Sequence, residues 1–457
     1  MSDTICAVST APGTGGIAVI RISGPSALSA VAPLWKGKSL FDVKTHTAHL
    51  GDICDPLTGE LIDRGVATVF RAPHSYTGQD TVELSVHGSR WIQEELVKQL
   101  IRQGARLAEP GEFTRRAFTA GRLDLAQVDA VADLIAARSR AAHRIATSQM
   151  KGSFSRRLAG LRHSLVELAS LLELELDFSD QEVEFASRQR LRDIARQIHD
   201  EIDRLCKSFD RGQAIAEGIP VAIVGDTNAG KSTLLNRLVD NDRAIVSEHR
   251  GTTRDTIEET ATIGDIMFRF IDTAGIRITD DPVEAMGIER SRQALHRARI
   301  ILWVIDSTMT DQEITHTFNQ IFDGIDFNSK TLIAVANKRD LTRRTIRLPY
   351  GEGMLRTIDI AAATGEGIDP LKDEIIRLSG ISDDADDITV TNLRHYQALD
   401  RARTAISRVI SDLDTEEYGV FVAQSLREVI DCLGEITGTV TDTEILATIF
   451  SRFCIGK

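Results

Sequence analysis

A phosphate-binding loop constrains this chain more than any other feature of its sequence. Residues 225–232 read GDTNAGKS, which fits the pattern G-x-x-x-x-G-K-S, and they stand between a strand-like run at 221–224 and a helical stretch. Glycines let the backbone N–H groups of such a loop cradle a β-phosphate at the helix N-terminus. We expect Lys231 to reach the β- and γ-phosphates and Ser232 to bind Mg²⁺. The residues predicted to contact the nucleotide here are Asn228, Ala229, Gly230, Lys231, Ser232 and Thr233.

Two later motifs indicate that the nucleotide is GTP. Residues 272–275 read DTAG, where Asp272 can hold the Mg²⁺ shell and Gly275 can sense the γ-phosphate. Residues 337–340 read NKRD, and the Asp340 carboxylate can accept from guanine N1–H and the 2-amino group, a donor pair that adenine lacks. Leaving that carboxylate unpaired costs about 1–3 kcal/mol, which favours GTP over ATP. The predicted contacts in this part are Asp272, Thr273, Ala274, Gly275, Asn337, Lys338 and Asp340, with mainly backbone contacts from Ala361, Ala362 and Ala363.

The catalytic group for hydrolysis is less evident. Residues 251–255, GTTRD, lie where a switch segment would supply a threonine to Mg²⁺, and Thr253 is the favoured one. Directly after DTAG stands Ile276, whose apolar side chain cannot orient water, so another group must do so. Position alone does not choose among the polar candidates of this segment, which are Arg277, Asp280, Asp281 and Glu284.

The sequence pattern changes several times along the chain, which indicates several domains. A chain of 457 residues is also too long for one ordinary domain. Strand-like runs at 16–22 and 81–86, with a helical pattern at 92–103, predict an α+β domain first. Amphipathic helices follow from about residue 119. Strand-like runs at 221–224, 267–271, 300–305 and 331–336 alternate with helical stretches, which predicts a doubly wound α/β domain with a mainly parallel sheet. The apolar spacing typical of helices appears again after residue 380, so we infer that the α/β domain is inserted into a split helical domain.

Composition narrows the classes of function and compartment. The chain has 54 Lys+Arg against 67 Asp+Glu and a net charge of −13, which excludes a protein that coats nucleic acid over its whole surface. Its five cysteines are scattered, so neither a disulfide framework nor a structural zinc site is indicated. The N-terminus lacks the features of a signal peptide, and the apolar run 300–305 is too short to span a bilayer. We expect a soluble, cytoplasmic protein with no membrane association.

Together with motifs near both ends, this pattern resembles the MnmE (TrmE) family of tRNA-modification GTPases, and the likeness runs in order over essentially the whole chain. The motifs are APGTGG at 11–16, VIRISG at 19–24, YTG at 76–78, HG at 87–88, PGEFTRRAF at 110–118 and FCIGK at 453–457. The resemblance implies an N-terminal folate-binding and dimerising domain (1–118), a discontinuous helical domain (119–216 and 381–457) and an inserted Ras-like P-loop GTPase domain (217–380).

It also implies an activity and partners. Members are K⁺-activated GTPases that act as homodimers with the flavoprotein MnmG (GidA), which carries FAD, in a heterotetramer or larger complex. With a one-carbon unit from 5-formyl- or methylene-tetrahydrofolate, they add an aminomethyl or carboxymethylaminomethyl group to C5 of the tRNA wobble uridine. GTP hydrolysis drives a conformational change. The sequence does not indicate the amine donor, the set of tRNAs, the stoichiometry or which partner carries the tRNA binding.

Site residues carried over from the family fall into four groups. Glu284 matches the catalytic glutamate that orients water, and Cys454 could be a thiol near the modification site. The K⁺ ligands would be Asn228, Ser247, His249 and Thr252. The segment before and within the switch would contact GTP through Ser247, Glu248, His249, Arg250, Gly251, Thr252 and Thr253. Folate would be bound by Arg21, Glu83, Arg122 and Lys457.

Two other functions share the same GTPase motifs. One is a ribosome-assembly GTPase, although such factors normally append an RNA-binding module, and the N-terminal domain and the C-terminal FCIGK speak against it. The other is a free-standing folate enzyme regulated by GTP. GTP hydrolysis is common to all three and cannot separate them.

Overall fold

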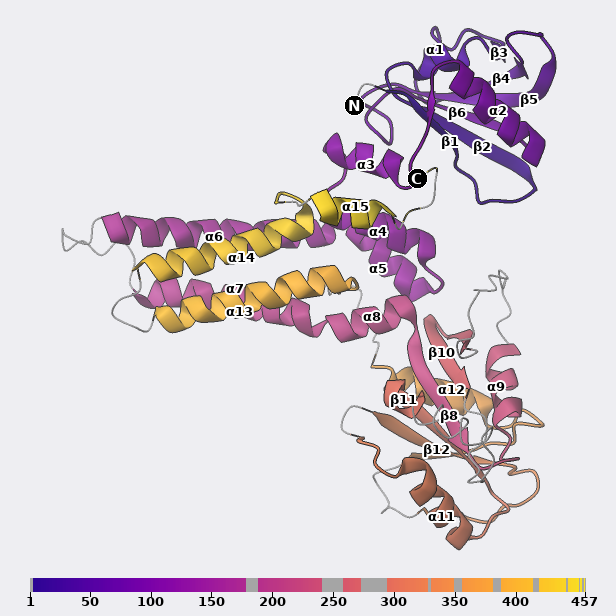
Figure 1. Ribbon diagram of the computed structural model, residues 1–457. Coiled ribbons are helices and arrows are strands. Elements are labelled where there is room, and N and C mark those ends of the chain that lie inside the picture. The colour runs from indigo at the N-terminus through magenta and orange to yellow at the C-terminus, as the bar shows by residue number, and fades with distance from the viewer. Residues whose placement is uncertain are drawn as a thin grey trace. The chain divides into compact units, whose positions relative to one another are not determined.

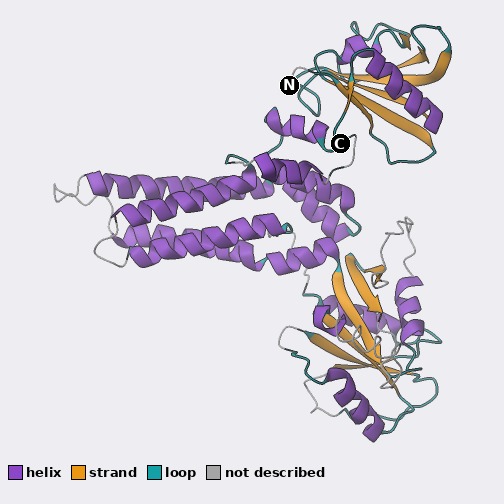
Figure 2. Ribbon diagram, in the orientation of Figure 1, coloured by secondary structure: helices purple, strands orange, loops and turns teal. Residues whose placement is uncertain are grey.

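The computed structural model describes residues 3–177, 188–240, 258–272, 294–327, 330–348, 356–380, 388–413, 419–440, 443–451, 453 and 456. The chain divides into two compact units. The first comprises Met1–Ile135, Ser148–His199 and Arg401–Lys457, and the second comprises Ala136–Thr147 and Asp200–Asp400. Each unit has its own sheet (Figures 1 and 2).

The first unit begins with a seven-stranded sheet in the order β3-β4-β5-β6-β2-β1-β7. All neighbours are antiparallel except β1 and β7. The strands are β1 (Ile5–Val8), β2 (Gly15–Ser23), β3 (Trp35–Lys36), β4 (Thr47–Cys54), β5 (Leu61–Phe70), β6 (Thr81–Gly88) and β7 (Arg106–Leu107). Helices α1 (Ala27–Val31) and α2 (Arg90–Arg102) accompany it, and α3 (Glu112–Thr119) follows. The predicted α+β architecture is therefore confirmed.

Side-chain alternation explains the core of this sheet. Ile20 and Ile22 of β2 and Leu84 of β6 are fully buried in one cluster with Leu96 and Leu100 of α2. Residues at the intervening positions of the strands point to the opposite face, because successive side chains of a strand alternate. The register places Arg21 on that face directly opposite Glu83.

Long helices make up the rest of the first unit. They are α4 (Leu125–Ala136), α6 (Ser153–Asp177), α14 (Gly419–Thr437) and α15 (Thr443–Ser451), while α7 (Arg188–Lys207) and α13 (Leu393–Asp412) each contribute part of their length. Helices α6 and α14 lie side by side although they are far apart in sequence (Figure 1). On α6, Leu161, Leu165, Leu168 and Leu172 are buried, as the helical spacing predicts.

The second unit contains a six-stranded sheet in the order β13-β12-β11-β8-β10-β9, parallel except for the pair β9 and β10. Its strands are β8 (Ile219–Gly225), β9 (Glu258–Ile263), β10 (Ile266–Asp272), β11 (Ile300–Asp306), β12 (Thr331–Asn337) and β13 (Arg356–Asp359). Its helices include α5 (Arg140–Met150), α8 (Phe209–Glu217), α9 (Lys231–Asp240), α11 (Asp311–Phe322) and α12 (Ile368–Leu378).

Helices cover both faces of this sheet. Leu234 of α9 and Leu371 of α12 pack in one buried cluster, and Phe318 of α11 packs with Trp303 in another. The predicted doubly wound, mainly parallel α/β domain is therefore confirmed, and its four predicted strands correspond to β8, β10, β11 and β12.

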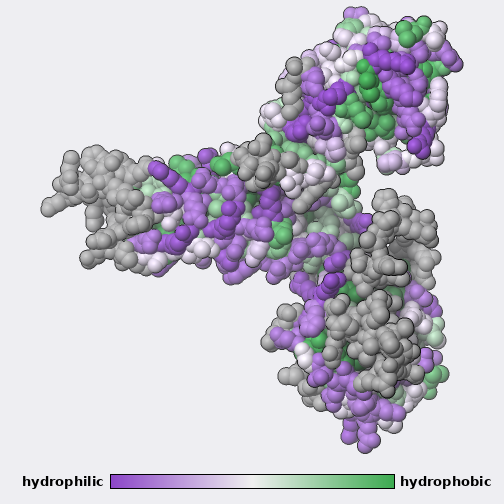
Figure 3. Space-filling model, in the orientation of Figure 1, coloured by the Kyte–Doolittle hydropathy of each residue, from purple (hydrophilic) through white to green (hydrophobic). Residues whose placement is uncertain are grey.

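The visible surface of the described helices is mostly hydrophilic, with isolated apolar residues (Figure 3). Among the described helices, none combines the length and apolar character needed to cross a membrane.

Candidate functional site

The phosphate-binding loop connects the end of β8 to the start of α9, as predicted. Gly225 and Gly230 have φ values of 152° and 95°, in the region that favours glycine. A Cβ at Gly225 would lie 2.2 Å from the carbonyl oxygen of Val304, and one at Gly230 would lie 2.2 Å from Asn337 Nδ2. Both positions therefore require glycine for packing as well as for backbone conformation.

Lys231 lies against the loop that it is predicted to serve. Its Nζ donates to the carbonyl oxygens of Gly225 and Asp226, at 3.0 and 2.9 Å. The ammonium group thus spans the loop where an anionic phosphate would sit. Asn228, the predicted K⁺ ligand, is exposed at the turn with φ 66°, an uncommon value for a residue other than glycine.

Two residues of types that bind Mg²⁺ come from backbone positions at the same edge of the sheet. Ser232 is exposed in the first turn of α9. Asp272 is the last residue of β10, which runs parallel to β8 with Asp272 opposite Ile223. Because parallel strands end at one edge of a sheet, Asp272 and the loop after β8 lie at that edge. Hydroxyl and carboxylate oxygens are ligands that Mg²⁺ prefers, so these two residues fit the ion.

Asn337, at the end of β12, connects two loops of the nucleotide site. Its buried side chain donates from Nδ2 to the carbonyl oxygen of Ala229, at 2.7 Å, and accepts at Oδ1 from the N–H of Ala362, at 2.9 Å. The amide therefore joins the phosphate loop to the predicted guanine loop. Asp340, the predicted guanine reader, is exposed just beyond the strand.

Lys338 has a partner that sequence reasoning missed. Its backbone is left-handed, with φ 66°, and its Nζ donates to Oδ2 of Asp306 at 2.7 Å. Burial opposes ionisation of Asp306, but hydrogen bonds from Lys338 and Thr308 hold its pKa below the usual range. Asp306 ends β11, so the rule that polar residues gather at the carboxyl edge could have identified it.

The guanine loop is held by backbone bonds and by Arg237. The N–H groups of Thr364 and Gly365 both donate to the carbonyl oxygen of Ala361, at 3.1 and 2.8 Å. From α9, Arg237 donates Nε to the carbonyl oxygen of Ala362, at 3.1 Å, and Nη2 to that of Ala363, at 2.7 Å. The structure thus links Ala362 to the phosphate loop through Asn337, and it links Ala362 and Ala363 to α9 through Arg237, which the motifs did not indicate.

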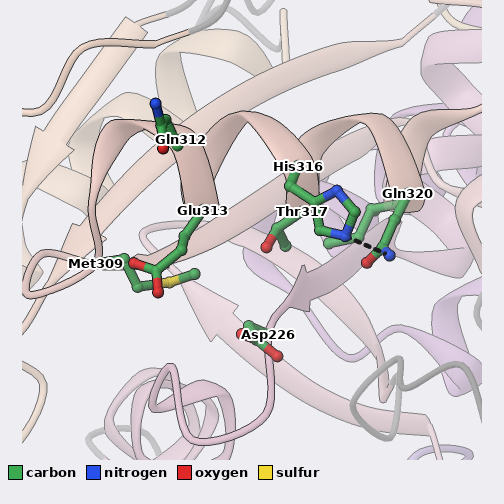
Figure 4. A pocket seen from close by; sticks show the side chains of 8 residues that line it. Asp226, Met309, Gln312, Glu313, His316, Thr317 and Gln320 are labelled. Atoms are coloured by element: carbon green, nitrogen blue, oxygen red, sulfur yellow. Dashed lines mark hydrogen bonds between the residues drawn. The ribbon is translucent and has the colours of Figure 1, made fainter.

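A pocket of about 380 Å³ lies between Asp226 of the phosphate loop and α11 (Figure 4). Glu313 extends from α11 on the side of Asp226, and the ring of His316, which also lines the pocket, is hydrogen-bonded to Gln320 at 2.8 Å. Its lining carries two carboxylates, Asp226 and Glu313, which repel phosphate. The turn before α9, which Lys231 contacts, is therefore the better phosphate site.

In the first unit, Arg21 and Glu83 form a second candidate site. Arg21 Nε donates to Glu83 Oε1 at 2.8 Å, and the side chains are 18% and 25% exposed, so the pair is sheltered yet reachable. The Arg21 guanidinium also lies over two aromatic rings, 5.6 Å from the centroid of Tyr76 and 5.5 Å from that of Phe113. Sequence reasoning did not single out these rings as site residues.

Two further elements border this pair. Tyr76 shares a hydrogen bond of 2.9 Å with Thr114, and burial raises the pKa of Tyr76. Arg122 donates to the carbonyl oxygen of Pro73 at 2.9 Å, at the start of the loop that carries Tyr76. The structure therefore brings Arg21, Glu83 and Arg122, three of the four predicted folate residues, to one region of the first unit.

The PGEFTRRAF motif has a clear structural role. Glu112 is buried and accepts from Arg106 at 2.7 Å and from Arg116 at 2.9 Å. Burial opposes its ionisation, yet these hydrogen bonds hold the pKa of Glu112 below its usual value. The network anchors the start of α3, from which Phe113 reaches the Arg21 guanidinium.

The C-terminal segment meets the first strands of the same unit. The carbonyl oxygen of Gly456 accepts from Ser9 Oγ at 3.0 Å. A Cβ at Gly456 would lie 2.2 Å from the carbonyl oxygen of Val8, and its φ is 99°, so glycine is required. The end of the predicted FCIGK motif therefore lies beside β1.

Several predicted residues lie outside the described part of the chain. They are Ser247, Glu248, His249, Arg250, Gly251, Thr252, Thr253, Thr273, Ala274, Gly275, Glu284, Cys454 and Lys457. Within the described residues, no group of three or more His, Cys, Asp or Glu side chains could hold a metal ion.

Comparison with known proteins covers the whole chain. Residues 125–454 match the family described as the MnmE helical domain, and residues 4–122 match the GTP-binding protein TrmE N-terminus. The tRNA modification GTPase MnmE of Bacteroides thetaiotaomicron is 46% identical over 467 residues, covering 100% of this chain and 99% of that protein. The protein of the same name from Parabacteroides distasonis is 48% identical over 464 residues, covering 99% and 100%.

Solved structures match over smaller portions. An Era variant from Aquifex aeolicus bound to GDP.AlF4- is 28% identical, with a TM-score of 0.28, over 40% of this chain and 65% of that chain. The G domain of the T. maritima FeoB iron transporter is 21% identical, with a TM-score of 0.27, over 35% and 98%.

Proposed function

The chain belongs to the MnmE family of tRNA modification GTPases, and from that premise we propose that it is a K⁺-activated GTPase acting with the flavoprotein MnmG on C5 of the tRNA wobble uridine. It is a GTP hydrolase of tRNA modification that uses Mg²⁺. The observation that carries the location of the nucleotide site is the side-chain amide of Asn337, which joins the phosphate loop to the predicted guanine loop. A one-carbon unit from 5-formyl- or methylene-tetrahydrofolate would enter the new aminomethyl or carboxymethylaminomethyl group.

In the nucleotide site, Lys231 would contact the β- and γ-phosphates. Mg²⁺ would be held by Ser232 and Thr253, with Asp272 in its outer shell. Asp340 would read the guanine N1–H and 2-amino group. Support comes from the described members of this set, which all lie at the carboxyl edge of the sheet.

Hydrolysis would depend on K⁺ and on Glu284. The ligands of K⁺ would be Asn228, Ser247, His249 and Thr252, of which Asn228 is exposed at the turn of the phosphate loop. A cation there supplies the positive charge that neutralises charge developing between the phosphates. Glu284 would orient the attacking water, since the residue after DTAG is the apolar Ile276.

In the first unit, tetrahydrofolate would bind next to Arg21 and Glu83. The Glu83 carboxylate can accept from the N–H donors of a pterin ring, and the hydrogen bond from Arg21 holds that carboxylate in place. Arg122 and Lys457 would supply positive charge for the carboxylates of the folate tail. Cys454 is proposed as a thiol near the modification site.

The proposed assembly is a homodimer in a heterotetramer or larger complex with MnmG, which would carry FAD and much of the tRNA binding. A net charge of −13 supports that division, because RNA phosphates favour a basic partner. We propose domain limits of 1–118 (folate binding and dimerisation), 119–216 with 381–457 (helical) and 217–380 (GTPase).

The test is nucleoside mass spectrometry of bulk tRNA from cells lacking the gene. C5-aminomethyl-type wobble uridines should vanish and return with the intact gene. They should not return with Lys231→Ala, which removes the phosphate cation, or with Arg21→Ala. Unchanged wobble uridines would refute the modification role and bring the ribosome-assembly alternative forward. Return with Lys231→Ala would show that GTP turnover is not required.

A further inference from the structure

Arg237 connects the phosphate end of the nucleotide site to its base end. It lies on α9, the helix that begins with Lys231. Its guanidinium makes two hydrogen bonds to successive carbonyl oxygens of the guanine loop, those of Ala362 and Ala363, at 3.1 and 2.7 Å. A planar guanidinium is suited to such paired acceptors, because its N–H groups form a rigid fork.

The guanine loop, residues 361–365, needs hydrogen bonds from outside the loop to fix its conformation. Its three alanines offer no polar side-chain atoms, and the nearby Gly365 and Gly367 have φ values of 92° and 78°. Glycines in that region lose much conformational entropy on ordering, so bonds from outside the loop must fix its shape. Arg237 supplies two such bonds and Asn337 supplies another, to the Ala362 N–H.

These bonds account for all but one backbone amide of the loop. The N–H groups of Ala361, Thr364 and Gly365 donate within the loop or to Glu366, and that of Ala362 donates to Asn337. Among the five described amides of residues 361–365, the Ala363 N–H is the one without a hydrogen bond to a protein acceptor. This N–H belongs to the same planar peptide group as the Ala362 carbonyl, which accepts from Arg237 Nε at 3.1 Å.

We propose that Arg237 is a specificity-positioning residue, which orients the guanine loop so that the Ala363 N–H donates to the 6-oxo group of the purine. The inference rests on the proposed guanine site and deepens it. Guanine and hypoxanthine present an acceptor at this position, whereas adenine presents an amino group that cannot accept. Arg237 thus contributes to the choice of base without touching it, and it complements Asp340, which reads the opposite donors.

The experiment measures nucleotide affinity in the full-length protein with Mg²⁺, by competition against a fluorescent GDP. Three competitors are compared. GDP has all the groups of guanine, and IDP keeps the 6-oxo group and N1–H but lacks the 2-amino group. The third, 2-aminopurine riboside diphosphate, keeps the 2-amino group but lacks the 6-oxo group and N1–H. For Arg237→Ala we expect GDP and IDP each to bind about tenfold more weakly and the 2-aminopurine nucleotide to change less than twofold. The GDP and IDP affinities of Arg237→Lys should lie between those of the parent protein and those of Arg237→Ala, because an ammonium does not bridge two carbonyls as the guanidinium fork does.

The outcomes separate this inference from the site on which it rests. An equal loss for all three nucleotides would mean that Arg237 acts on the phosphate loop or on folding, and no loss would mean that it does not position the base; either result overturns the inference. Asp340→Asn is the companion variant, and we expect it to lower the affinity for GDP more than the affinity for IDP. If Asp340→Asn changes the affinities for the nucleotides unequally while Arg237→Ala does not, that result would support the guanine site and contradict the role of Arg237. If neither variant changes the affinities for the three nucleotides unequally, the proposed guanine site itself is wrong.

Discussion

Single polar side chains join distant segments at the nucleotide site. Asn337 bonds to Ala229, 108 residues before it, and to Ala362, 25 residues after it. Lys338 bonds to Asp306 rather than to either loop. Two neighbouring residues of one motif therefore have different roles, since one joins the loops and the other anchors the strand end. A buried amide with both ends occupied is costly to replace, because its partners lose their bonds together.

The role of Glu284 can be tested at the residue scale. Glu284→Ala should lower the GTP turnover rate about 100-fold or more while GTP affinity stays within about twofold, because water orientation matters in the transition state and not in binding. Steady-state phosphate release and equilibrium binding measure the two quantities. Asp281→Ala, in the same acidic segment, serves as the matched control and should keep its turnover. A Glu284→Ala protein that turned over GTP at the parental rate would remove this residue from the mechanism.

At the scale of elements, strand register decides which side chains meet. The pairing of β2 with β6 sets Arg21 opposite Glu83, and the start of α3 adds the ring of Phe113. The pairing of β4 with β5 sets Arg64 opposite Asp52 in the same way, but there the side chains are 67% and 44% exposed. The same cross-strand geometry thus produces a sheltered pair in one place and a solvated pair in another.

That contrast supplies a matched test of the proposed folate site. Arg21→Ala should weaken 5-formyltetrahydrofolate binding about tenfold or more, since it removes a charged hydrogen bond from a sheltered carboxylate. Arg64→Ala should leave the affinity within about twofold, because exposed ion pairs contribute little. Isothermal titration calorimetry measures both. Equal affinities in the two variants would argue against the proposed role of Arg21.

A second element-scale prediction concerns pH. Hydrogen bonds from Arg377 and Arg356, which outweigh the opposing burial, lower the pKa of Glu374 on α12 to about 2. Since the unfolded value is 4.5, the resulting stability is fully present above pH 4.5 and is lost as pH falls toward 2. Glu374→Gln should therefore cost about 1–2 kcal/mol of unfolding free energy at pH 7, in the lower part of the range because both arginines are more than half exposed.

Urea unfolding at pH 7, 5 and 3 measures this cost for the parent and the variant. The difference should shrink between pH 5 and pH 3. Asp373→Asn, at the exposed neighbouring position, should change stability little at any of these pH values. A Glu374→Gln difference that stayed constant down to pH 3 would show that ionisation of this carboxylate does not stabilise the fold.

At the scale of the whole molecule, the two candidate sites belong to different compact units. The nucleotide site is in the second unit, and the Arg21–Glu83 pair is in the first. In the proposed function, GTP hydrolysis in the second unit would affect the proposed folate site in the first through a conformational change that couples the two units. The conformational change that the family resemblance implies for GTP hydrolysis is a change of this kind.

The K⁺ proposal predicts a cation dependence of the intact protein. GTP turnover should be more than about tenfold faster in KCl than in NaCl at equal ionic strength, because a cation at the phosphates offsets developing charge. Asn228→Ala should abolish the difference, whereas Thr227→Ala, at the adjacent exposed position, should retain it. Turnover that is equal in the two salts would contradict K⁺ activation.

Much of the architecture was determined by the sequence by itself. The glycine and lysine spacing of residues 225–232, the strand-like runs around it and the helical periodicity of α6 depend on local backbone geometry, which the chain carries wherever it folds. The α+β start and the doubly wound sheet could be predicted for this reason, as could the presence of a nucleotide site.

Only the tertiary structure decided which partners those residues meet. The bonds of Arg237 to carbonyls 125 and 126 residues away, the pairing of Lys338 with Asp306 and the rings around Arg21 have no signature in local spacing. Such contacts arise when strands that are distant in sequence end at one edge of a sheet, or pair in one register. A motif specifies the conformation of its own backbone, whereas packing specifies its neighbours, because side-chain contacts depend on every element that meets there.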